Sequence, residues 1–376
     1  MDFNYTPEQD MLRESVARYL ADHYDFRARQ AMVRSASGWH PEIWRGLAEE
    51  IGVLGASFPE AHGGLGGGPV ESMIVMEEIG RSLAIEPYLE TVVVGGGLLQ
   101  AWNAPRTGEW LQAIASGQAR FALAQLEPGR RYDPAAVETR AEQRDGGWHV
   151  TGVKDSVRAA PFATHLLVTA RTAGSVRDRT GVSVFLVARD APGVTLREYP
   201  TVDGSRTADV RFDAAAGELL GEAGRGLDLL DPALDAGVAG LCAEAVGVMR
   251  RLVADTVDYT RQRRQFDAPI ASNQVLQHRM VDMYIALEQS VSMACLATLR
   301  LSGTPTERVH AVSAAKVFIG KAARAVGQAA IQLHGGMGMT DETAVSHYFR
   351  RATMLESQLG SVDYHAARIE QLEVAA

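Results

Sequence analysis

A group of arginines in the last third of the chain is the first candidate for a binding site. Arg261, Arg263 and Arg264 lie within one turn of a possible helix. A guanidinium group donates hydrogen bonds in a fixed geometry, so such a cluster could bind an anion locally. The alternative is a solvated helix end, which is the usual setting for such a run. The net charge of −9 leaves no basic excess for neutralising phosphates, which argues against a general nucleic-acid binder.

Other residue types that could form a site show weaker patterns. The glycine-rich run from Gly63 to Gly68 follows no expected strand and does not fit a dinucleotide-binding fingerprint, so we expect a flexible turn. Cys242 and Cys295 lie in apolar helical patterns, which indicates reduced core residues. No cysteine or histidine spacing suggests a metal site. The polar start and the lack of an apolar run approaching membrane-span length predict a cytoplasmic protein without a membrane span.

The first third of the chain has helical periodicity. Thr6 to Gln9 has the form of a capping box with proline at the first helical position, and an apolar face follows from Met11 to Leu20. Further helices are expected at about Ile43 to Leu54 and Val70 to Leu83.

The pattern changes near Gly117 to short runs rich in β-branched and aromatic residues. Asp145-Gly146 separates two such runs and is a favourable hairpin turn. The segment therefore predicts an antiparallel β domain and not a set of βαβ units. The expected strands include Phe121 to Leu123, Trp148 to Val153, His165 to Ala170 and Val182 to Val187.

Helical periodicity returns after Gly226, in four long segments with short connections that predict a four-helix bundle. These segments cover about Leu234 to Thr256, Asn273 to Leu301, Thr306 to Leu333 and Glu342 to Leu372. The predicted fold is therefore an α+β multi-domain protein. It has an N-terminal helical domain at 1–117, a middle antiparallel β domain at 118–228 and a C-terminal four-helix bundle at 229–376.

Two segments are specific enough to indicate a family. The run YTRQRRQFDAPIASNQ, from Tyr259 to Gln274, resembles the acyl-CoA dehydrogenase signature between the first two helices of the C-terminal bundle. The run QLHGGMG, from Gln332 to Gly338, followed by Arg350, resembles the family's segment between the third and fourth helices. PEAHGGLG, from Pro59, and more weakly the run from Phe121 to Pro128, are also similar to the family.

The resemblance covers essentially the whole chain and implies the same three-part architecture. Within the family, the chain resembles the small subunit of pimeloyl-CoA dehydrogenase and the base-lacking subunits of mixed-tetramer steroid side-chain acyl-CoA dehydrogenases. It implies FAD as cofactor, an acyl-CoA substrate and a tetrameric assembly. In this family a carboxylate base removes the α-proton of a CoA thioester while the flavin accepts the β-hydride. Each FAD site is shared between neighbouring subunits.

The half of the FAD site that a subunit donates to its neighbour matches the family in this sequence. The resemblance places Arg263 near the pyrophosphate, where a bidentate donor suits an anion. The glycines permit close approach of the backbone. The residues that match family positions are Arg263, Phe266, Gln274, Gln332, Gly335 and Gly336.

The half that should hold the chain's own flavin departs from the family. The family's Thr-Glu-Pro is Leu126-Glu127-Pro128 here, and its Gly-Ser-Asp is Arg131-Tyr132-Asp133. Its Trp-Ile-Thr, which lies along the flavin ring, is Ser156-Val157-Arg158. The arginines at 130, 131 and 158 could suit a carboxylated acyl chain, although surface or structural pairing is the preferred interpretation.

Both positions at which the family keeps its catalytic base lack a carboxylate. Aligned from Gly335-Gly336, the first falls on Leu359, and the second, early in the first bundle helix, falls on Gly237. Glu356 lies three residues before Leu359 and is the weak candidate for a displaced base. Glu244 lies two helical turns after Gly237, roughly 10 Å along the axis. A salt bridge for Glu356 and an ordinary polar helix position for Glu244 are the preferred interpretations.

The preferred prediction is a subunit of an FAD-dependent acyl-CoA dehydrogenase that completes the FAD site of a homologous catalytic subunit, in an α2β2 assembly. Three alternatives stay open. The chain could be a self-sufficient homo-oligomeric enzyme with a displaced base, or a family member with different chemistry, such as desulfination of a CoA thioester. It could also be a non-enzymatic interaction protein on the same scaffold.

Overall fold

The computed structural model describes residues 4–375, and the chain divides into two compact units. The helical unit contains Met1–Ala31, Pro69–Ala84 and Val238–Ala376, and the sheet unit contains Met32–Gly68 and Ile85–Gly237. The division falls within helices α2 (Phe26–Arg34) and α7 (Gly226–Gln262). The order of helices, then strands, then long helices confirms the predicted fold class, while the limits of the three domains stay a prediction.

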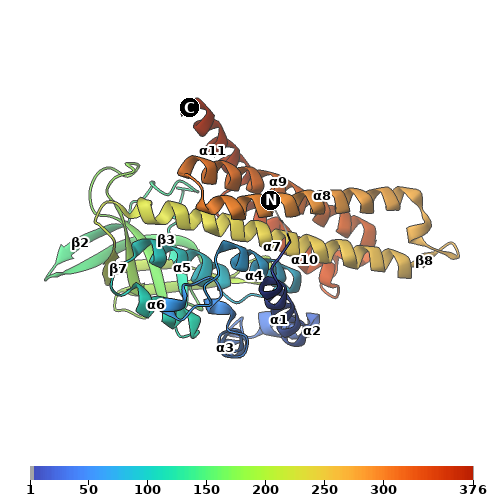
Figure 1. Ribbon diagram of the computed structural model, residues 1–376, viewed down its shortest axis with the longest axis horizontal. Helices are drawn as coiled ribbons and strands as arrows, with labels where there is room; N and C mark the ends of the chain where they lie inside the picture. Colours follow the sequence, from blue (N-terminus) through green and yellow to red (C-terminus); the bar gives the residue numbers. More distant parts are fainter. Residues whose placement is uncertain (1–3, 376) are drawn as a thin grey trace. The chain divides into compact units, whose positions relative to one another are not determined.

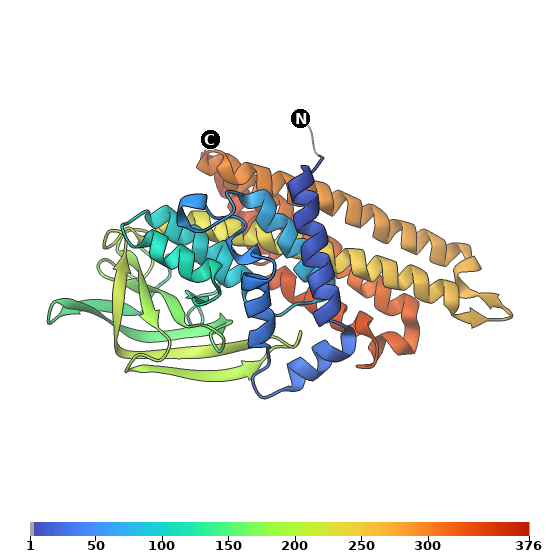
Figure 2. The same cartoon turned by 60° about the horizontal axis from the view of Figure 1, so that its bottom comes forward.

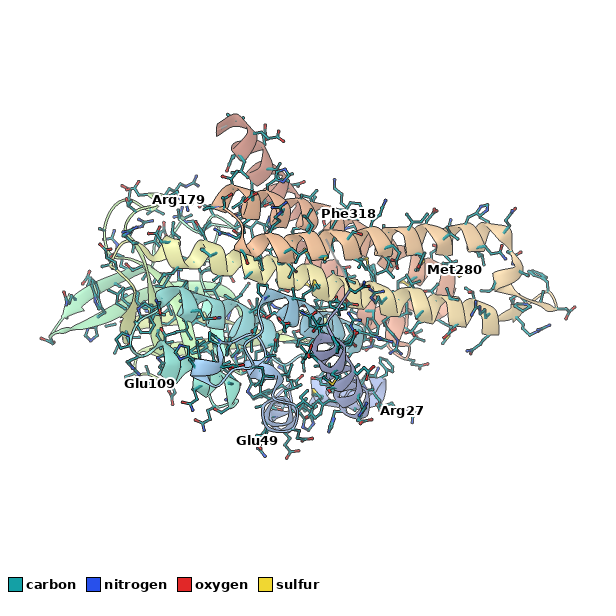
Figure 3. The ribbon with its side chains drawn as sticks, in the orientation of Figure 1. Arg27, Glu49, Glu109, Arg179, Met280 and Phe318 are labelled. Atoms are coloured by element: carbon teal, nitrogen blue, oxygen red, sulfur yellow. The ribbon has the colours of Figure 1, made fainter. Side chains whose placement is uncertain are left out.

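Long antiparallel helices dominate the helical unit. Figure 1 shows α7 and α8 running side by side to a short β turn, and Figure 2 shows the same pair from another side. Thr260 of α7 donates to the sulfur of Met280 on α8, which Figure 3 labels. The elements of this unit, besides α7, are α1 (Pro7–His23), α4 (Pro69–Ser82), β8 (Arg264–Gln265), β9 (Ala268–Pro269), α8 (Gln274–Leu299), α9 (Pro305–His334), α10 (Ala344–Ser357) and α11 (Val362–Ala375).

Local sequence signals account for the start of the chain. Thr6 caps α1 by accepting from the backbone N–H of Gln9, and the Gln9 side chain accepts from Thr6, so the predicted capping box forms. Val16, Tyr19 and Leu20 are buried as expected. Met11 lies 59% exposed and does not belong to the buried face.

The fourth bundle helix, predicted as continuous, is broken in two. α10 ends at Ser357 and α11 begins at Val362. Between them, Leu359 has φ 53° and Gly360 has φ 115°, a backbone that an α-helix does not permit. The prediction of one helix from Glu342 to Leu372 was therefore wrong at this point.

The sheet unit contains a seven-stranded sheet with strand order β1-β4-β2-β3-β7-β5, in which β6 also pairs with β7. Because β5 pairs with both β7 and β4, the sheet closes on itself. The strands are β1 (Phe121–Ala124), β2 (Arg140–Arg144), β3 (Gly147–Arg158), β4 (His165–Arg171), β5 (Val182–Ala188), β6 (Val194–Pro200) and β7 (Arg206–Leu220). The helices of this unit, besides α2 and α7, are α3 (Pro41–Glu49), α5 (Gly96–Trp102) and α6 (Thr107–Ala115), with a π-helix, η3, at Leu89–Gly95.

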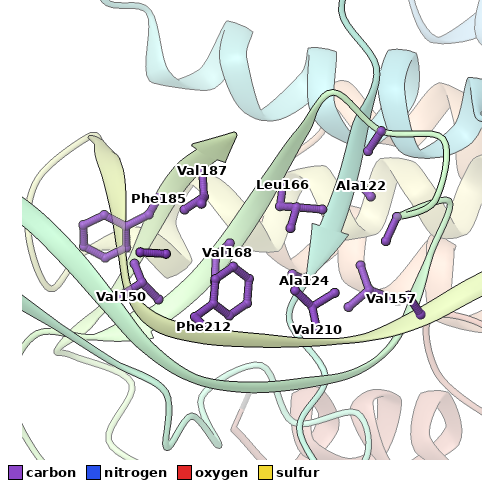
Figure 4. Close-up of a cluster of buried hydrophobic side chains, with 14 of the residues drawn as sticks. Ala122, Ala124, Val150, Val157, Leu166, Val168, Phe185, Val187, Val210 and Phe212 are labelled. Carbon is purple, nitrogen blue, oxygen red and sulfur yellow. The ribbon is translucent and has the colours of Figure 1, made fainter. Parts of the chain in front are cut away.

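Most strand pairs are antiparallel, and Asp145-Gly146 forms the expected turn between β2 and β3, with φ 51° and 80°. β1 pairs with β4 in parallel, which the prediction of a purely antiparallel domain did not include. Side chains of the strands fill the interior of the sheet, as Figure 4 shows. This core includes Ala122, Val150, Val157, Leu166, Val168, Phe185, Val187, Val210 and Phe212.

Helix α7 is long and apolar enough, by length and composition, to cross a membrane. The expectation that no apolar run approaches that length was therefore wrong. The most apolar window of α7 is 83% buried inside the protein, so packing accounts for its composition.

Candidate functional site

Arg263 directly follows α7 and presents a free charge to solvent. Its backbone N–H donates to Tyr259 at 2.8 Å, and its carbonyl accepts from Ile270 at 2.9 Å, so the backbone is fixed. The guanidinium is exposed and forms no ion pair with any residue in the range 4–375. A fixed backbone with an unpaired guanidinium is an arrangement that can bind an external anion.

Phe266 lies at the tip of the β8–β9 turn and is fully exposed. Phe266 and Asp267 occupy the two central positions of this turn, with φ 51° and 62°. Such turns prefer Asn-Gly or Asp-Gly, so a phenylalanine with positive φ carries backbone strain. Strain and a fully exposed ring together indicate that the tip serves contact with another molecule.

The other predicted residues lie at neighbouring helix ends. Gln274 is the first residue of α8, and Gln332 lies in the last turn of α9. Tyr259 of α7 stacks on His334 of α9, with ring centroids 4.3 Å apart, and its hydroxyl donates to the His334 carbonyl at 3.3 Å. This contact brings the end of α7, which carries Arg263, next to the end of α9.

Gly335 and Gly336 follow α9 on the same surface. Gly335 has φ 61°, which favours glycine, whereas Gly336 has no positive φ. A Cβ atom added to either would meet no atom within 4 Å. Internal packing therefore does not require glycine at 336, and the open backbone could be approached closely by an external ligand.

The segment predicted to hold the chain's own flavin is occupied by internal contacts. Arg158 at the end of β3 lies 3.5 Å from Glu90 of η3 and 3.9 Å from Asp203, and its Nη2 atom donates to Ser205 at 3.4 Å. Asp203 is fully buried. The two carboxylates bear out the pairing interpretation of this arginine inside the sheet unit, while its buried Nε and Nη1 atoms form no hydrogen bond with the described residues.

Glu127 has a structural role in the same unit. Its carboxylate accepts from the backbone N–H groups of Glu138 and Thr139 at 2.6 and 3.0 Å, and from Lys154 at 2.7 Å. Lys154 also donates to Thr169 at 2.9 Å. Burial lowers the pKa of Lys154 to about 8, against the effect of Glu127, which raises it. The buried lysine escaped prediction because nothing in the local pattern marks it.

Leu359, at the first family base position, lies in the turn between α10 and α11. Lys316 of α9 donates to the carbonyls of Leu355 and, at 2.9 Å, Gln358, which satisfies the free end of α10. His365 of α11 lies 3.0 Å from the Leu359 carbonyl and 3.2 Å from the Ser313 hydroxyl. Because the carbonyl only accepts, Nε2 of His365 carries the proton and Nδ1 accepts. Buried polar groups therefore fix this turn, although it carries an aliphatic side chain.

Neither nearby glutamate is free to replace the base. Glu356 pairs with Arg324 of α9, so the predicted salt bridge forms with a neighbouring helix. Glu244 is buried and accepts from Arg351 of α10 at 2.5 and 2.7 Å. The expectation of an ordinary polar position for Glu244 was wrong, because it is one half of a buried ion pair. Gly237, at the second base position, lies buried within α7.

The two cysteines differ in their burial. Cys242 is buried, and burial raises the pKa of its thiol to about 12, as expected of an inert core residue. Cys295 on α8 is free and only half-buried, so it is not a core residue. Among residues 4–375, no group of three or more histidine, cysteine or acidic side chains could hold a metal ion.

Comparison with known proteins gives matches along nearly the whole chain. Three family models match: "Acyl-CoA dehydrogenase, N-terminal domain" at residues 6–118, "middle domain" at 122–215 and "C-terminal domain" at 224–371. The chain is similar to the mitochondrial short-chain specific acyl-CoA dehydrogenase of Mus musculus, at 30% identity over 336 residues, which covers 87% of this chain and 80% of that protein.

Two solved structures are also similar. One is the ChsE4-ChsE5 complex from Mycobacterium tuberculosis, at 27% identity and a TM-score of 0.90, with 100% of both chains covered. The other is a variant of the Tcur3481-Tcur3483 steroid ACAD, at 27% identity and a TM-score of 0.89, with 98% of both chains covered.

Proposed function

Because the chain belongs to the acyl-CoA dehydrogenase family, we propose that it is the complementing subunit of an α2β2 acyl-CoA dehydrogenase. It completes the FAD site of a homologous catalytic partner and does not itself remove the substrate's α-proton. The observation that carries this proposal is the turn at Leu359. It is held in place by Lys316 and His365 but presents no carboxylate, while Glu356 and Glu244 are engaged in ion pairs.

FAD is the cofactor of this family, and when bound it accepts the hydride from the substrate's β-carbon. The donated surface of this chain fits part of such a molecule. Arg263 supplies an unpaired guanidinium for the pyrophosphate, and the backbone at Gly335 and Gly336 leaves room for close approach. Phe266 supplies an exposed aromatic ring on the turn that follows Arg263.

The chain's own flavin surface does not fit the cofactor in the same way. The position that the resemblance places beside the flavin ring is Arg158, whose guanidinium is compensated by Glu90 and Asp203. Accommodating a flavin ring there would require displacing a charge from two carboxylates that are largely buried, which is costly. The loss of the ring platform in the sheet unit and the loss of the base in the helical unit are two independent departures from the family, and together they favour a vestigial function over a relocated base.

The similarity to two solved structures, of which the ChsE4-ChsE5 structure is described as a complex, supports a mixed assembly. One of them is a steroid ACAD, which supports a role for this chain in lipid or steroid catabolism. The proposed partners are thus a homologous subunit that carries a glutamate at the position equivalent to Leu359, and an acyl-CoA substrate bound by the complex. We also propose that the complex is located in the cytoplasm.

Reconstitution tests this assignment. The chain and its base-carrying homologue are purified separately and together, and dehydrogenation of acyl-CoA substrates is measured with an artificial electron acceptor. Activity only in the mixture is the expected result. Activity of the homologue alone, undiminished by omitting this chain, would contradict the proposal.

A further inference from the structure

Tyr259, in the last turn of α7, makes contacts that lead to both parts of the donated surface. Its backbone carbonyl accepts from the N–H of Arg263 at 2.8 Å. Its hydroxyl donates to the backbone carbonyl of His334 at 3.3 Å, one residue before Gly335. Arg263 and the glycine pair follow different helices, and the same tyrosine links the two.

The side chain of His334 holds the tyrosine ring in a defined orientation. Nδ1 of His334 lies 2.8 Å from the carbonyl oxygen of Ala330, one turn earlier in α9. Because a carbonyl only accepts, Nδ1 carries the proton. Burial lowers the pKa of His334, against the Ala330 carbonyl and Asp255, which raise it, so the imidazole is neutral at about pH 7. The ring of Tyr259 stacks on this fixed imidazole, with centroids 4.3 Å apart and 22° between the planes.

The glycine segment after α9 is tied to the last turn of that helix. The N–H of Gly335 donates to the carbonyl of Ile331, which closes the end of the helix. A Cβ atom at Gly338 would lie 2.8 Å from the same carbonyl oxygen, so the segment packs closely against the helix. The Tyr259 contact with the end of α9 therefore also places the glycine segment relative to Arg263.

We propose that Tyr259 and His334 are positioning residues that set the separation between Arg263 and the Gly335-Gly336 backbone for one FAD molecule. A single ligand uses two contacts fully only when both are held within about 0.5 Å of the productive geometry. The inference rests on the proposed function for the statement that this surface contacts FAD. It assigns no chemical step to either residue.

Variants of Tyr259 in the assembled complex test the inference through the dissociation constant of FAD, measured by flavin fluorescence on titrating the deflavinated complex. Tyr259→Phe removes the hydroxyl and keeps the ring, so the fold should survive and the dissociation constant should rise by about 2–10-fold. Tyr259→Leu also removes the stack and should weaken FAD binding further. Unchanged FAD binding in both variants would overturn the inference.

The matched control is a second tyrosine–histidine stack in the helical unit. Tyr19 of α1 stacks on His23 with the same 4.3 Å between centroids, and α1 carries none of the residues of the donated surface. Tyr19→Leu should lower the thermal midpoint and leave the dissociation constant of FAD unchanged. If Tyr19→Leu weakens FAD binding as much as Tyr259→Leu does, the effect is a general loss of structure and the inference is wrong.

A double variant shows whether Tyr259 acts through Arg263. Two residues that act on one contact have coupled effects, whereas independent sites have effects that multiply. Tyr259→Leu should therefore raise the dissociation constant of FAD by a smaller factor in the Arg263→Ala background than on its own. An equal factor in both backgrounds would overturn the inference.

The unmodified complex tests the proposed function separately. If the unmodified chain forms a homo-oligomer with one FAD per chain, the proposed function alone is contradicted, and the same variants test the positioning in that assembly. Unchanged FAD binding by the Tyr259 variants, in an unmodified complex that holds about one FAD for every two chains, contradicts only the positioning role. Absence of FAD from every assembly of the chain would contradict both.

Discussion

Arg351 of α10 donates to both carboxylate oxygens of Glu244 of α7, at 2.5 and 2.7 Å, inside the helical bundle. The same guanidinium also donates to Gln358 at 3.2 Å, immediately before Leu359. The pair therefore ties α7 to the turn at which the family keeps its base. It also removes Glu244 from consideration as a displaced base, since both oxygens are already occupied.

Breaking the Glu244–Arg351 ion pair should lower the stability of the chain and should not act on the catalysed reaction directly. Glu244→Gln leaves the buried charge of Arg351 uncompensated, so the free energy of unfolding should fall by about 3–5 kcal/mol. Urea denaturation of the isolated chain measures this. Glu370→Gln, on an exposed side chain of α11, should leave the midpoint unchanged. A loss of turnover in the assembled complex at full stability would show that Glu244 does act in the reaction.

Glu356→Gln tests the remaining candidate for a displaced base. A positioned general base contributes about 10²–10⁴-fold to rate. Because Glu356 is paired with Arg324, we expect turnover of the assembled complex to change by only a few-fold. The matching change at the partner's base glutamate should abolish turnover and serves as the positive control. A large loss with Glu356→Gln, with substrate binding kept, would favour the self-sufficient enzyme.

Arg263→Ala should weaken retention of FAD by the complex. Losing a charge-assisted contact costs roughly 1.5–3 kcal/mol, or about 10–100-fold in affinity. The fold should survive, because the side chain contacts no other charged group in the described range. Arg261→Ala removes an equivalent exposed charge from the last turn of α7 and is the control. If both variants retain flavin equally well, Arg263 is only a solvated residue at a helix end.

Gly336→Ala separates a ligand-facing glycine from a structural one. A Cβ atom at 336 meets nothing, so stability should change by less than about 0.5 kcal/mol while FAD retention by the complex falls. At Gly64, the added atom would lie 2.1 Å from the carbonyl oxygen of Phe58, so Gly64→Ala should lower the thermal midpoint instead. Undiminished FAD retention in Gly336→Ala would remove Gly336 from the donated surface.

Acid should destabilise the chain through His365. Burial lowers the pKa of this imidazole to about 3, with smaller contributions from Arg368 and Lys316, against the Leu359 carbonyl, which raises it. In the unfolded chain the pKa is about 6.5, so between these values the unfolded state binds the extra proton. Stability should therefore fall as pH drops below about 6.5, by up to about 1.4 kcal/mol per pH unit from this group.

The comparison with His365→Asn isolates that contribution. The variant should lose less stability between about pH 6.5 and about pH 4 than the unmodified chain, whatever its stability at neutral pH. Chemical denaturation at several pH values gives both slopes. Equal slopes would mean that His365 titrates normally and is not held neutral between Ser313 and Leu359.

Much of the fold follows from local pattern. The capping box at Thr6 and the turn at Asp145-Gly146 formed where their residue types predicted, because both depend on neighbours in sequence. The break between α10 and α11 did not follow, because helical spacing continues across it. The break depends on the backbone of Leu359 and on Lys316, which lies in a different helix of the bundle. The parallel pairing of β1 with β4 is likewise set by tertiary contacts.

The candidate site likewise contains some residues that the sequence identified and others that it did not. Arg263 and the Gly335-Gly336 pair were found through resemblance, because their residue types alone are equally typical of helix ends. The Glu244–Arg351 pair was missed because its members lie 107 residues apart, and an ion pair between distant helices leaves no local signal. Lys154 and His365 were missed for the same reason.

The flavin content of the purified chain and of its complex tests the central claim most directly. The chain is expressed alone and with its base-carrying homologue, and bound FAD is quantified by absorbance after denaturation. The account predicts little FAD in the isolated chain and about one FAD for every two chains in the complex, because each site takes its donated half from this chain. One tightly bound FAD per chain in a pure homo-oligomer that dehydrogenates acyl-CoA would contradict it.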